Sequence, residues 1–384
     1  MRSTLDVLAL GCSAVAVAGC LHALFAAWLL HGRRGGKIVE APPSDEAVTV
    51  LKPLHGAEPG LYEHLASFCD QAHAGPLQIL LGVQDPRDPA AAVAERLRSA
   101  YPGIDIELCV GARGAARNPK IANLAGMQPR IRHAVLVVSD SDIAVGRDYL
   151  ARTLAALARP NTGSVTWLYR GVARSGLWAR LGSMAINHQF LPNVLVGLKL
   201  RLAHPCFGST IALKRATLES IGGFEAFSDC LADDYEIGRA IRATGLHVAI
   251  ADGLVSHACN EDSVQELFRH ELRWARTIRG IDPFGYAGSA VTYPLAFALA
   301  ALALNAGTVA AALVAAVLAC RIVLVAQADR WTGERSAAWL VPVRELVSFL
   351  VFAASHFVSA VSWRGRRLGV RADGTLQPSG RPTR

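Results

Sequence analysis

Apolar residues gather at the two ends of the 384-residue chain, and a longer, more polar stretch separates them. The first apolar stretch, Leu5–Leu30, exceeds the length of about 20 residues that crosses the hydrocarbon core of a bilayer. It predicts a transmembrane anchor within residues 1–36. A cleaved signal is the alternative, because Val17–Cys20 resembles a lipoprotein cleavage site. The apolar sequence nevertheless continues beyond that point, as a span requires.

Basic residues follow this first span directly, at Arg33, Arg34 and Lys37, whereas only Arg2 precedes it. Lysine and arginine are enriched on the cytoplasmic side of membrane spans. We therefore expect the residues after the span to lie in the cytosol.

The second apolar region extends over residues 289–363 and holds two candidate segments. Val291–Ala326 is interrupted at Asn305–Gly307, so it fits either one tilted span or a tight hairpin. Ala337–Val361 is the last candidate span. A basic tail, residues 364–384, follows it.

The middle of the chain alternates short apolar runs with helical patterns after a proline-rich linker at 41–44. Alternating strands and helices are typical of an α/β fold with a mostly parallel, doubly wound sheet. The predicted strands are Ala47–Leu54, Leu77–Val83, Ile104–Val110 and Ala134–Val138, and the helices between them are Glu63–Gln71 and Ala90–Ala100. Ser175–Leu200 is apolar but broken by polar residues, which favours an interfacial segment over a span.

Composition narrows the possible partners. The net charge is +8, and much of it lies beside the predicted spans or in the tail, which indicates contact with anionic lipid headgroups of the bilayer and no nucleic acid. The eight cysteines show neither CxxC pairs nor zinc-ligand spacing, so they fit a reducing compartment.

Acidic residues follow two of the predicted strands, where ligands bind in parallel sheets. Asp85 comes after the second strand, and Asp140-Ser141-Asp142 comes after the fourth. Two carboxylates at this spacing can converge on Mg²⁺ or Mn²⁺ together with substrate phosphates. A solvated turn is the alternative, because Asp and Ser are good turn formers.

A second acidic pair, Asp233-Asp234, opens a predicted helix at Glu236–Thr244. Carboxylates at a helix start can simply cap it. The functional alternative makes Asp234 a general base that removes the proton of an attacking hydroxyl.

Four further residues carry candidate chemistry. On the predicted helix Ser263–Arg279, Arg273 offers a fork for a diphosphate and Trp274 an apolar wall, unless the helix only lies at the membrane surface. Lys120, in a basic loop, can meet a donor phosphate or be a solvated lysine. His188 can orient an acceptor hydroxyl or be merely amphipathic, whereas Cys206 fits a small buried hydrophobe better than a reactive thiol.

The order of these motifs resembles the inverting family 2 glycosyltransferases with a GT-A fold, in the branch that contains ceramide glucosyltransferases. The pattern of that branch is D, then D or DxD, then D and (Q/R)xxRW. It corresponds here to Asp85, Asp140–Asp142, Asp234 and the segment from His270 to Trp274, and Asn118–Leu124 is similar to the NPKxxNL stretch of the branch. The resemblance extends over about Val48–Gly280. His270 departs from the pattern, because Gln or Arg is usual at its position.

This resemblance implies a GT-A catalytic domain, flanked by transmembrane helices, with a nucleotide-sugar-binding half (45–174) and an acceptor-binding half with interfacial helices (175–288). It implies that Asp85, Lys120, Asp140, Arg273 and Trp274 contact the UDP-sugar donor and that Asp140 and Asp142 hold Mg²⁺ or Mn²⁺. Asp234 would be the catalytic base, and His188 and His270 would contact the membrane lipid acceptor. The implied location is the bacterial inner membrane, with the catalytic domain facing the cytosol.

Within the branch, the segments Arg269–Gly280, Pro342–Leu346 and Trp363–Arg367 are most similar to bacterial hopanoid-associated glycosyltransferases. That similarity implies transfer of N-acetylglucosamine from UDP-GlcNAc to bacteriohopanetetrol. A ceramide glucosyltransferase that uses UDP-glucose is the first alternative. A metal-dependent hydrolase of nucleotide sugars or lipid diphosphates is the second, and a lipid-binding scaffold would explain the spans but not the acidic strand ends.

Overall fold

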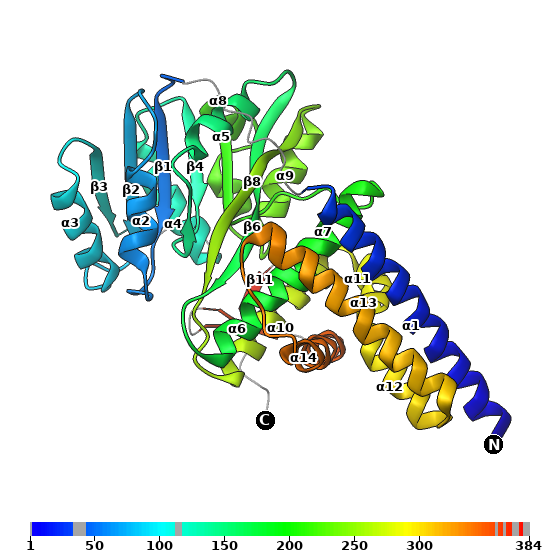
Figure 1. Ribbon diagram of the computed structural model, residues 1–384. Helices are drawn as coiled ribbons and strands as arrows, with labels where there is room; N and C mark the ends of the chain where they lie inside the picture. The colour runs from blue at the N-terminus through cyan, green and yellow to red at the C-terminus, as the bar shows by residue number, and fades with distance from the viewer. Residues whose placement is uncertain are drawn as a thin grey trace.

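An eight-stranded sheet forms the middle of the molecule, and long helices from both ends of the chain project together from one side of it (Figure 1). The computed structural model describes residues 2–33, 44–111, 117–357, 360–363, 366–370 and 376–378. Arg34 and Lys37 of the basic cluster, the linker at 41–43 and most of the basic tail lie outside the described residues.

The sheet has the strand order β3-β2-β1-β4-β7-β6-β8-β5. Neighbours from β3 to β4 are parallel, as are β6 and β8, whereas β7 is antiparallel to both of its neighbours and β5 is antiparallel to β8. The predicted α/β fold class is therefore confirmed, and each of the four predicted strands agrees with the structure to within one residue at either end. The bounds are β1 Val48–Pro53, β2 Leu77–Val83, β3 Asp105–Val110, β4 Val135–Ser139, β5 Ile143–Ala144, β6 Thr162–Ala173, β7 Thr210–Lys214 and β8 His247–Cys259.

Helices cover both faces of this sheet because its strands are apolar on both sides. In β1, Val50 packs with α2, α3 and α5 on one face, whereas Leu51 packs with α4, α8 and α9 on the other. The helix bounds are α2 Leu61–Cys69, α3 Ala90–Ala100, α4 Pro119–Met127, α5 Tyr149–Leu157, α8 Arg215–Ser220 and α9 Asp233–Ala243, with short 3₁₀ turns at Gln128–Arg130 and Phe224–Phe227.

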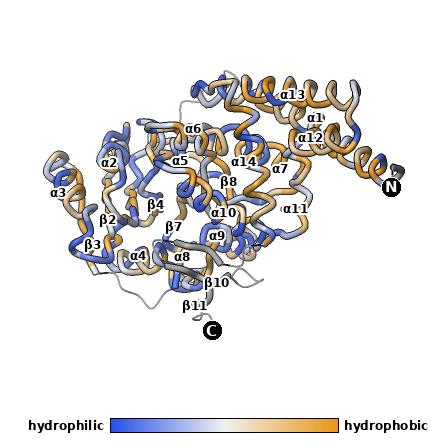
Figure 2. The backbone as a smooth tube through the Cα atoms, turned by 90° about the horizontal axis from the view of Figure 1, so that it is seen from below, coloured by the Kyte–Doolittle hydropathy of each residue, from blue (hydrophilic) through white to orange (hydrophobic). Residues whose placement is uncertain are grey.

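The remaining helices include the candidate membrane spans. Figure 2 shows α1, α12 and α13 as its most continuously apolar part. Their bounds are α1 Arg2–His31, α6 Gly176–Ala185, α7 Leu191–Lys199, α10 Val264–Ile281, α11 Pro283–Gly288, α12 Pro294–Leu304, α13 Thr308–Thr332 and α14 Leu340–Ser355, with a π-helical segment at Ile186–Phe190 and a 3₁₀ turn at Ser289–Thr292.

Within the described part of the chain, two helices are long and apolar enough to cross a membrane, Thr4–His31 and Thr308–Thr332. The segments Pro283–Thr292 and Pro294–Leu304 make a third candidate if they count as one span bent by 66°. The break at Asn305–Gly307 makes α12 and α13 a hairpin rather than one tilted span.

The predicted span at Ala337–Val361 is not among these candidates. Its helix, α14, has 16 residues, fewer than a span needs. It also buries Arg344 and Glu345, each in an ion pair with a neighbouring helix. After α14, the described residues form a small antiparallel sheet of β9 Ala360–Trp363, β10 Arg366–Val370 and β11 Leu376–Pro378.

The two candidate spanning helices, α1 and α13, pack directly on the sheet domain. Leu30 of α1 and Leu324 of α13 share an apolar cluster with Leu195 of α7 and Leu168 of β6. All eight cysteines are unpaired, as their spacing predicts.

Candidate active site

A cavity of about 490 Å³ lies at the carboxyl ends of β1 and β4, between the sheet and α10. Ligands of doubly wound sheets bind at this edge. Residues from several elements that are distant in sequence line the cavity, among them the predicted site residues Lys120, Asp140, Asp142, Asp234, His270, Arg273 and Trp274.

Lys120 enters the cavity from the start of α4, which begins there because Asn118 caps it. Asn118 Oδ1 accepts hydrogen bonds from the backbone N–H groups of Lys120 and Ile121, and Pro119 occupies the first helical position. The ammonium of Lys120 lies 2.7 Å from Asp140 Oδ1 and 3.6 Å from Asp233 Oδ2. Burial alone would lower the pKa of Lys120, but these two carboxylates outweigh it and raise the pKa, so the side chain stays charged.

The two aspartates of the Asp140–Asp142 turn have different surroundings. Burial raises the pKa of Asp140, although Lys120 opposes the shift. Burial alone would also raise the pKa of Asp142, but His257, whose Nδ1 lies 3.6 Å from Asp142 Oδ2, and Lys52 reverse the effect and lower it.

These two carboxylates fit a hard divalent cation in part. Asp142 Oδ1 is buried and has no hydrogen-bond partner among the described residues. No group of three or more His, Cys, Asp or Glu side chains in the described part of the chain is arranged to hold a metal ion. Mg²⁺ often takes one or two carboxylates and completes its shell with substrate phosphates and water, so Asp140 and Asp142 suit a cation that arrives with a phosphorylated ligand.

Lys52 of β1 supports the Asp140–Asp142 turn through its backbone, and no motif in the sequence indicated this residue. Its buried Nζ donates to the backbone oxygen of Asp140 at 2.5 Å and lies 4.1 Å from the centre of the Phe68 ring. Burial lowers the pKa of Lys52 to about 7, and Asp142 and Asp140 oppose that shift. A lysine within a strand buried on both faces is the sequence signal that could have indicated it.

Asp234 lies in the first turn of α9, where both of its carboxylate oxygens are held by the backbone. Oδ2 accepts from the N–H of Gly208 at 2.7 Å, and Oδ1 accepts from the N–H of Tyr235 at 2.8 Å. A side chain at Gly208 would place its Cβ 2.9 Å from Oδ2, so only glycine allows this approach. Burial, and then the charge of Asp233, raise the pKa of Asp234 to about 6.

Both aspartates lie in the first turn of α9, whose N-cap residue, Ala232, makes no side-chain capping hydrogen bond. Asp234 accepts from the N–H of Tyr235 within that turn, so the helix-start alternative also fits this residue. Asp233 faces Lys120 and accepts from Asn118 Nδ2 at 3.1 Å.

Helix α10 presents His270, Arg273 and Trp274 to the cavity because positions i, i+3 and i+4 share one face of a helix. The His270 ring lies edge-on to Trp274, with 4.4 Å between ring centroids, and its Nδ1 lies 2.8 Å from Glu261 Oε1. The neighbouring Glu271 forms two hydrogen bonds of 2.6 Å with the Arg344 guanidinium of α14.

Two predicted site residues do not line the cavity. Asp85 follows β2 and accepts from the backbone N–H of Arg87 at 2.9 Å, so its contact with a nucleotide stays a prediction. His188 is buried in the π-helical segment, where its Nε2 lies 2.8 Å from Asp329 Oδ1 of α13. The structure thus places His188 in a contact between helices, and its contact with an acceptor stays a prediction. Cys206 is buried in the apolar core, as expected.

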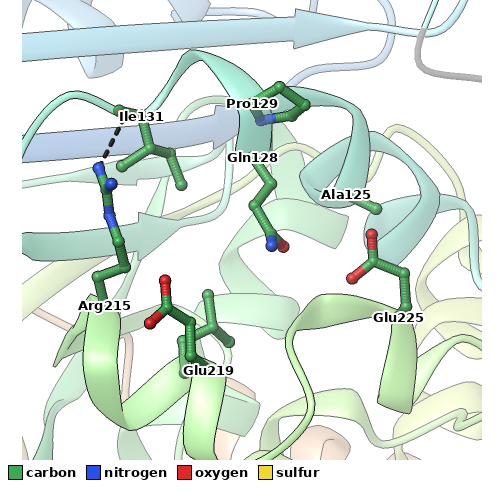
Figure 3. A pocket seen from close by; sticks show the side chains of 8 residues that line it. Ala125, Gln128, Pro129, Ile131, Arg215, Glu219 and Glu225 are labelled. Carbon is green, nitrogen blue, oxygen red and sulfur yellow. Dashed lines mark hydrogen bonds between the residues drawn. The ribbon is translucent and has the colours of Figure 1, made fainter.

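A second, smaller hollow of about 240 Å³ lies among α4, α8 and the two short 3₁₀ turns near them (Figure 3). It carries two carboxylates, Glu219 and Glu225, and its one arginine, Arg215, already donates to the backbone oxygen of Ile131 at 2.7 Å. This lining offers little to a diphosphate, whereas the larger cavity contains Lys120 and Arg273.

Comparisons with known proteins agree with this fold. Residues 11–376 match Glycosyl transferase family 21. Ceramide glucosyltransferase 1 of Caenorhabditis elegans is 26% identical over 271 residues, which are 69% of this chain and 56% of that protein. The ceramide glucosyltransferase of Komagataella phaffii is 32% identical over 127 residues, 32% of this chain and 25% of that protein. The chain thus spans about half, or less, of the length of these curated relatives.

A solved structure shows a similar fold over most of both chains. It is the mannosyltransferase PcManGT from Pyrobaculum calidifontis in complex with GDP-Man and Mn²⁺, with a TM-score of 0.55, 20% sequence identity, and coverage of 91% of this chain and 99% of that one. The predicted GT-A fold with flanking membrane helices is thereby confirmed.

Proposed function

Because this chain belongs to glycosyl transferase family 21, we propose that it transfers a sugar from a UDP-sugar to a hydroxyl group of a membrane lipid. The observation that carries the proposal is the cavity between the sheet and α10, which combines paired carboxylates, the cationic side chains of Lys120, Arg269 and Arg273, and the carboxylate of Asp234. We propose N-acetylglucosamine as the sugar and bacteriohopanetetrol as the lipid, on the similarity of Arg269–Gly280 and Pro342–Leu346 to hopanoid-associated enzymes. Transfer of glucose to ceramide is the second candidate, because the curated relatives carry that name.

The donor would lie across the carboxyl edge of the sheet, with its diphosphate near Arg273 and Lys120. A guanidinium can bind two phosphate oxygens at once, and the lysine adds a point charge. Asp140 and Asp142 would hold a Mg²⁺ or Mn²⁺ ion, which neutralises charge on a nucleoside diphosphate. On donor binding, Lys120 can exchange its contact with Asp140 for a phosphate, because both partners are anionic.

Asp234 would remove the proton of the acceptor hydroxyl as that oxygen bonds to the anomeric carbon of the sugar, while the bond from this carbon to the diphosphate oxygen breaks and UDP leaves. Each carboxylate oxygen of Asp234 accepts one hydrogen bond from a backbone N–H, so a second lone pair on each oxygen remains to accept the proton. A pKa of about 6 makes this carboxylate more basic than an exposed aspartate, yet ionised at neutral pH. A single displacement of this kind inverts the anomeric centre and needs no protein nucleophile.

Transfer by the full-length protein in detergent tests this function directly. Mass spectrometry of the lipid extract, after incubation with UDP-GlcNAc or UDP-glucose and either lipid, should show N-acetylglucosaminyl bacteriohopanetetrol. Glucosylceramide as the main product would favour the second candidate. Release of free sugar without any glycolipid would indicate a hydrolase and refute the proposal.

We also propose that the sheet domain faces the cytosol of a bacterial cell, with α1 and α13 in the inner membrane. Arg33 at the domain end of α1 supports this orientation. Ser99 is exposed on α3 of the sheet domain. Val309 is 84% exposed and lies at the start of α13, the end of this helix that projects away from the sheet (Figure 1). In intact cells a membrane-impermeant maleimide should label Val309→Cys above the parent protein, and should label Ser99→Cys only after permeabilisation. The reverse pattern would exclude the cytosolic orientation.

A further inference from the structure

Glu261, which belongs to none of the motifs, contacts His270, the residue that departs from the family pattern. Glu261 lies in the loop between β8 and α10, and its Oε1 is 2.8 Å from Nδ1 of His270. Its side chain is 9% exposed, whereas that of His270 is 28% exposed and lines the cavity. Gly182 of α6 leaves room for this carboxylate, because a Cβ at that position would lie 2.7 Å from Glu261 Oε2.

The contact fixes which edge of the imidazole faces the cavity. Burial alone would raise the pKa of Glu261, but His270 outweighs it and lowers the pKa, so the side chain is a carboxylate that can only accept hydrogen bonds. Nδ1 of His270 must therefore carry a hydrogen and donate it. The edge-on contact with Trp274 fixes the ring from a second side. In the neutral ring, Nε2 then carries a free lone pair on the edge away from Glu261.

We propose that Glu261 is a positioning residue for His270, and that His270 Nε2 accepts a hydrogen bond from a hydroxyl group of the acceptor. The inference rests on the proposed transfer to a lipid hydroxyl. A bare nitrogen lone pair attracts a hydroxyl hydrogen and repels a phosphate oxygen, which has no hydrogen to give. Arg273, one helical turn further along the same face, serves the diphosphate better. His270 thus belongs to the acceptor side of the cavity.

A double-mutant cycle on the full-length protein tests this inference through the Michaelis constants of both substrates. Glu261→Gln keeps the size of the side chain but removes the charge that holds the ring. We expect it to raise the KM for the lipid about three- to tenfold, the range for one hydrogen bond, with the KM for the UDP-sugar unchanged. In a His270→Gln background the same substitution should change the lipid KM less than about twofold, since its effect acts through the imidazole.

Each result then has one interpretation. An equal loss in both backgrounds would make Glu261 purely structural and overturn the inference, as would a rise in the UDP-sugar KM alone. Absence of lipid glycosylation by the wild-type protein would instead refute the proposed function. Glu95→Gln, which removes the carboxylate from a surface ion pair on α3, is the control for loss of one charge. If Glu261→Gln fails to fold, Gly182→Ala replaces it, because the added methyl group displaces the Glu261 carboxylate and should raise the same KM.

Discussion

Replacing Asp234 with asparagine tests the proposed base, but the structure shows that it changes two things at once. Both carboxylate oxygens accept backbone hydrogen bonds, from Gly208 and Tyr235. An asparagine side chain supplies one acceptor oxygen and one NH₂ group. One of the two backbone N–H groups must therefore face another donor. The substitution removes the proposed base and also breaks one partly buried hydrogen bond.

The two effects differ in size and appear in different measurements. Loss of a general base reduces turnover by a factor of about 10² to 10⁴, which corresponds to about 2.7 to 5.5 kcal/mol in the activation free energy. One unsatisfied buried N–H costs about 1–3 kcal/mol in the free energy of unfolding. Turnover of Asp234→Asn at a temperature where the variant is folded thus reports the base, and its thermal unfolding reports the hydrogen bond.

The matched control is Asp233→Asn, which removes a neighbouring negative charge without touching the backbone contacts of Asp234. We expect it to lower turnover less than tenfold, because the Asp233 carboxylate is engaged by the side chains of Lys120 and Asn118 and is not the proposed base. UDP affinity, measured by calorimetry on the same preparations, should be nearly unchanged in Asp234→Asn. Near wild-type turnover of that variant, or equal losses in turnover and UDP affinity, would refute its role as the base.

Three further predictions concern pH dependence, metal dependence and stability. Since burial raises the pKa of Asp234 to about 6 and a base must be ionised, kcat/KM should be constant above that pH and fall about tenfold per pH unit below it; a profile that stays flat down to pH 5 would contradict this. EDTA should abolish transfer and Mg²⁺ or Mn²⁺ should restore it better than Ca²⁺, whereas full activity in excess chelator would remove the Asp140–Asp142 turn from metal binding. Arg344→Ala leaves the carboxylate of Glu271 buried without its partner and should lower the free energy of unfolding by about 3–5 kcal/mol in denaturant titrations. Arg344→Met combined with Glu271→Leu should lose much less, and an equal loss would show that the charge is not the cause.

The sheet was predictable because its signal is local. Each strand from β1 to β4 is a short, mostly apolar segment ended by polar or turn residues, and β1, β2 and β4 are buried along nearly their whole length, as is typical of strands covered on both faces. Motif order also predicted that Asp140, Asp234 and Arg273 belong to one site, and the structure brings them to one cavity. The resemblance to ceramide glucosyltransferases is confirmed, and the family whose model matches the chain is glycosyl transferase family 21.

The remaining site residues depend on contacts between distant parts of the chain. Lys52 meets Asp140 only because β1 and β4 are paired in the sheet, and nothing near Lys52 in the sequence indicates that neighbour. Asp85 satisfies the motif, but β1 lies between β2 and β4, which places Asp85 two strands away from the Asp140 turn. His188 is explained by Asp329, 141 residues later, which the helix packing brings to its side.

Helices α10 and α14 together shape one wall of the cavity. Helix α10 carries the cavity residues His270 and Arg273 on one face. Glu271 follows His270 in the sequence, but its side chain points towards α14. The bidentate pair of Glu271 with Arg344 fixes both the rotation and the height of α10, since two parallel hydrogen bonds allow neither to change freely. Apolar contacts of Ala275 with α14 extend the same interface. The α14 segment is too short to span a bilayer, and its buried charges are costly in lipid, so its sequence is better explained as a support for α10 than as a membrane anchor.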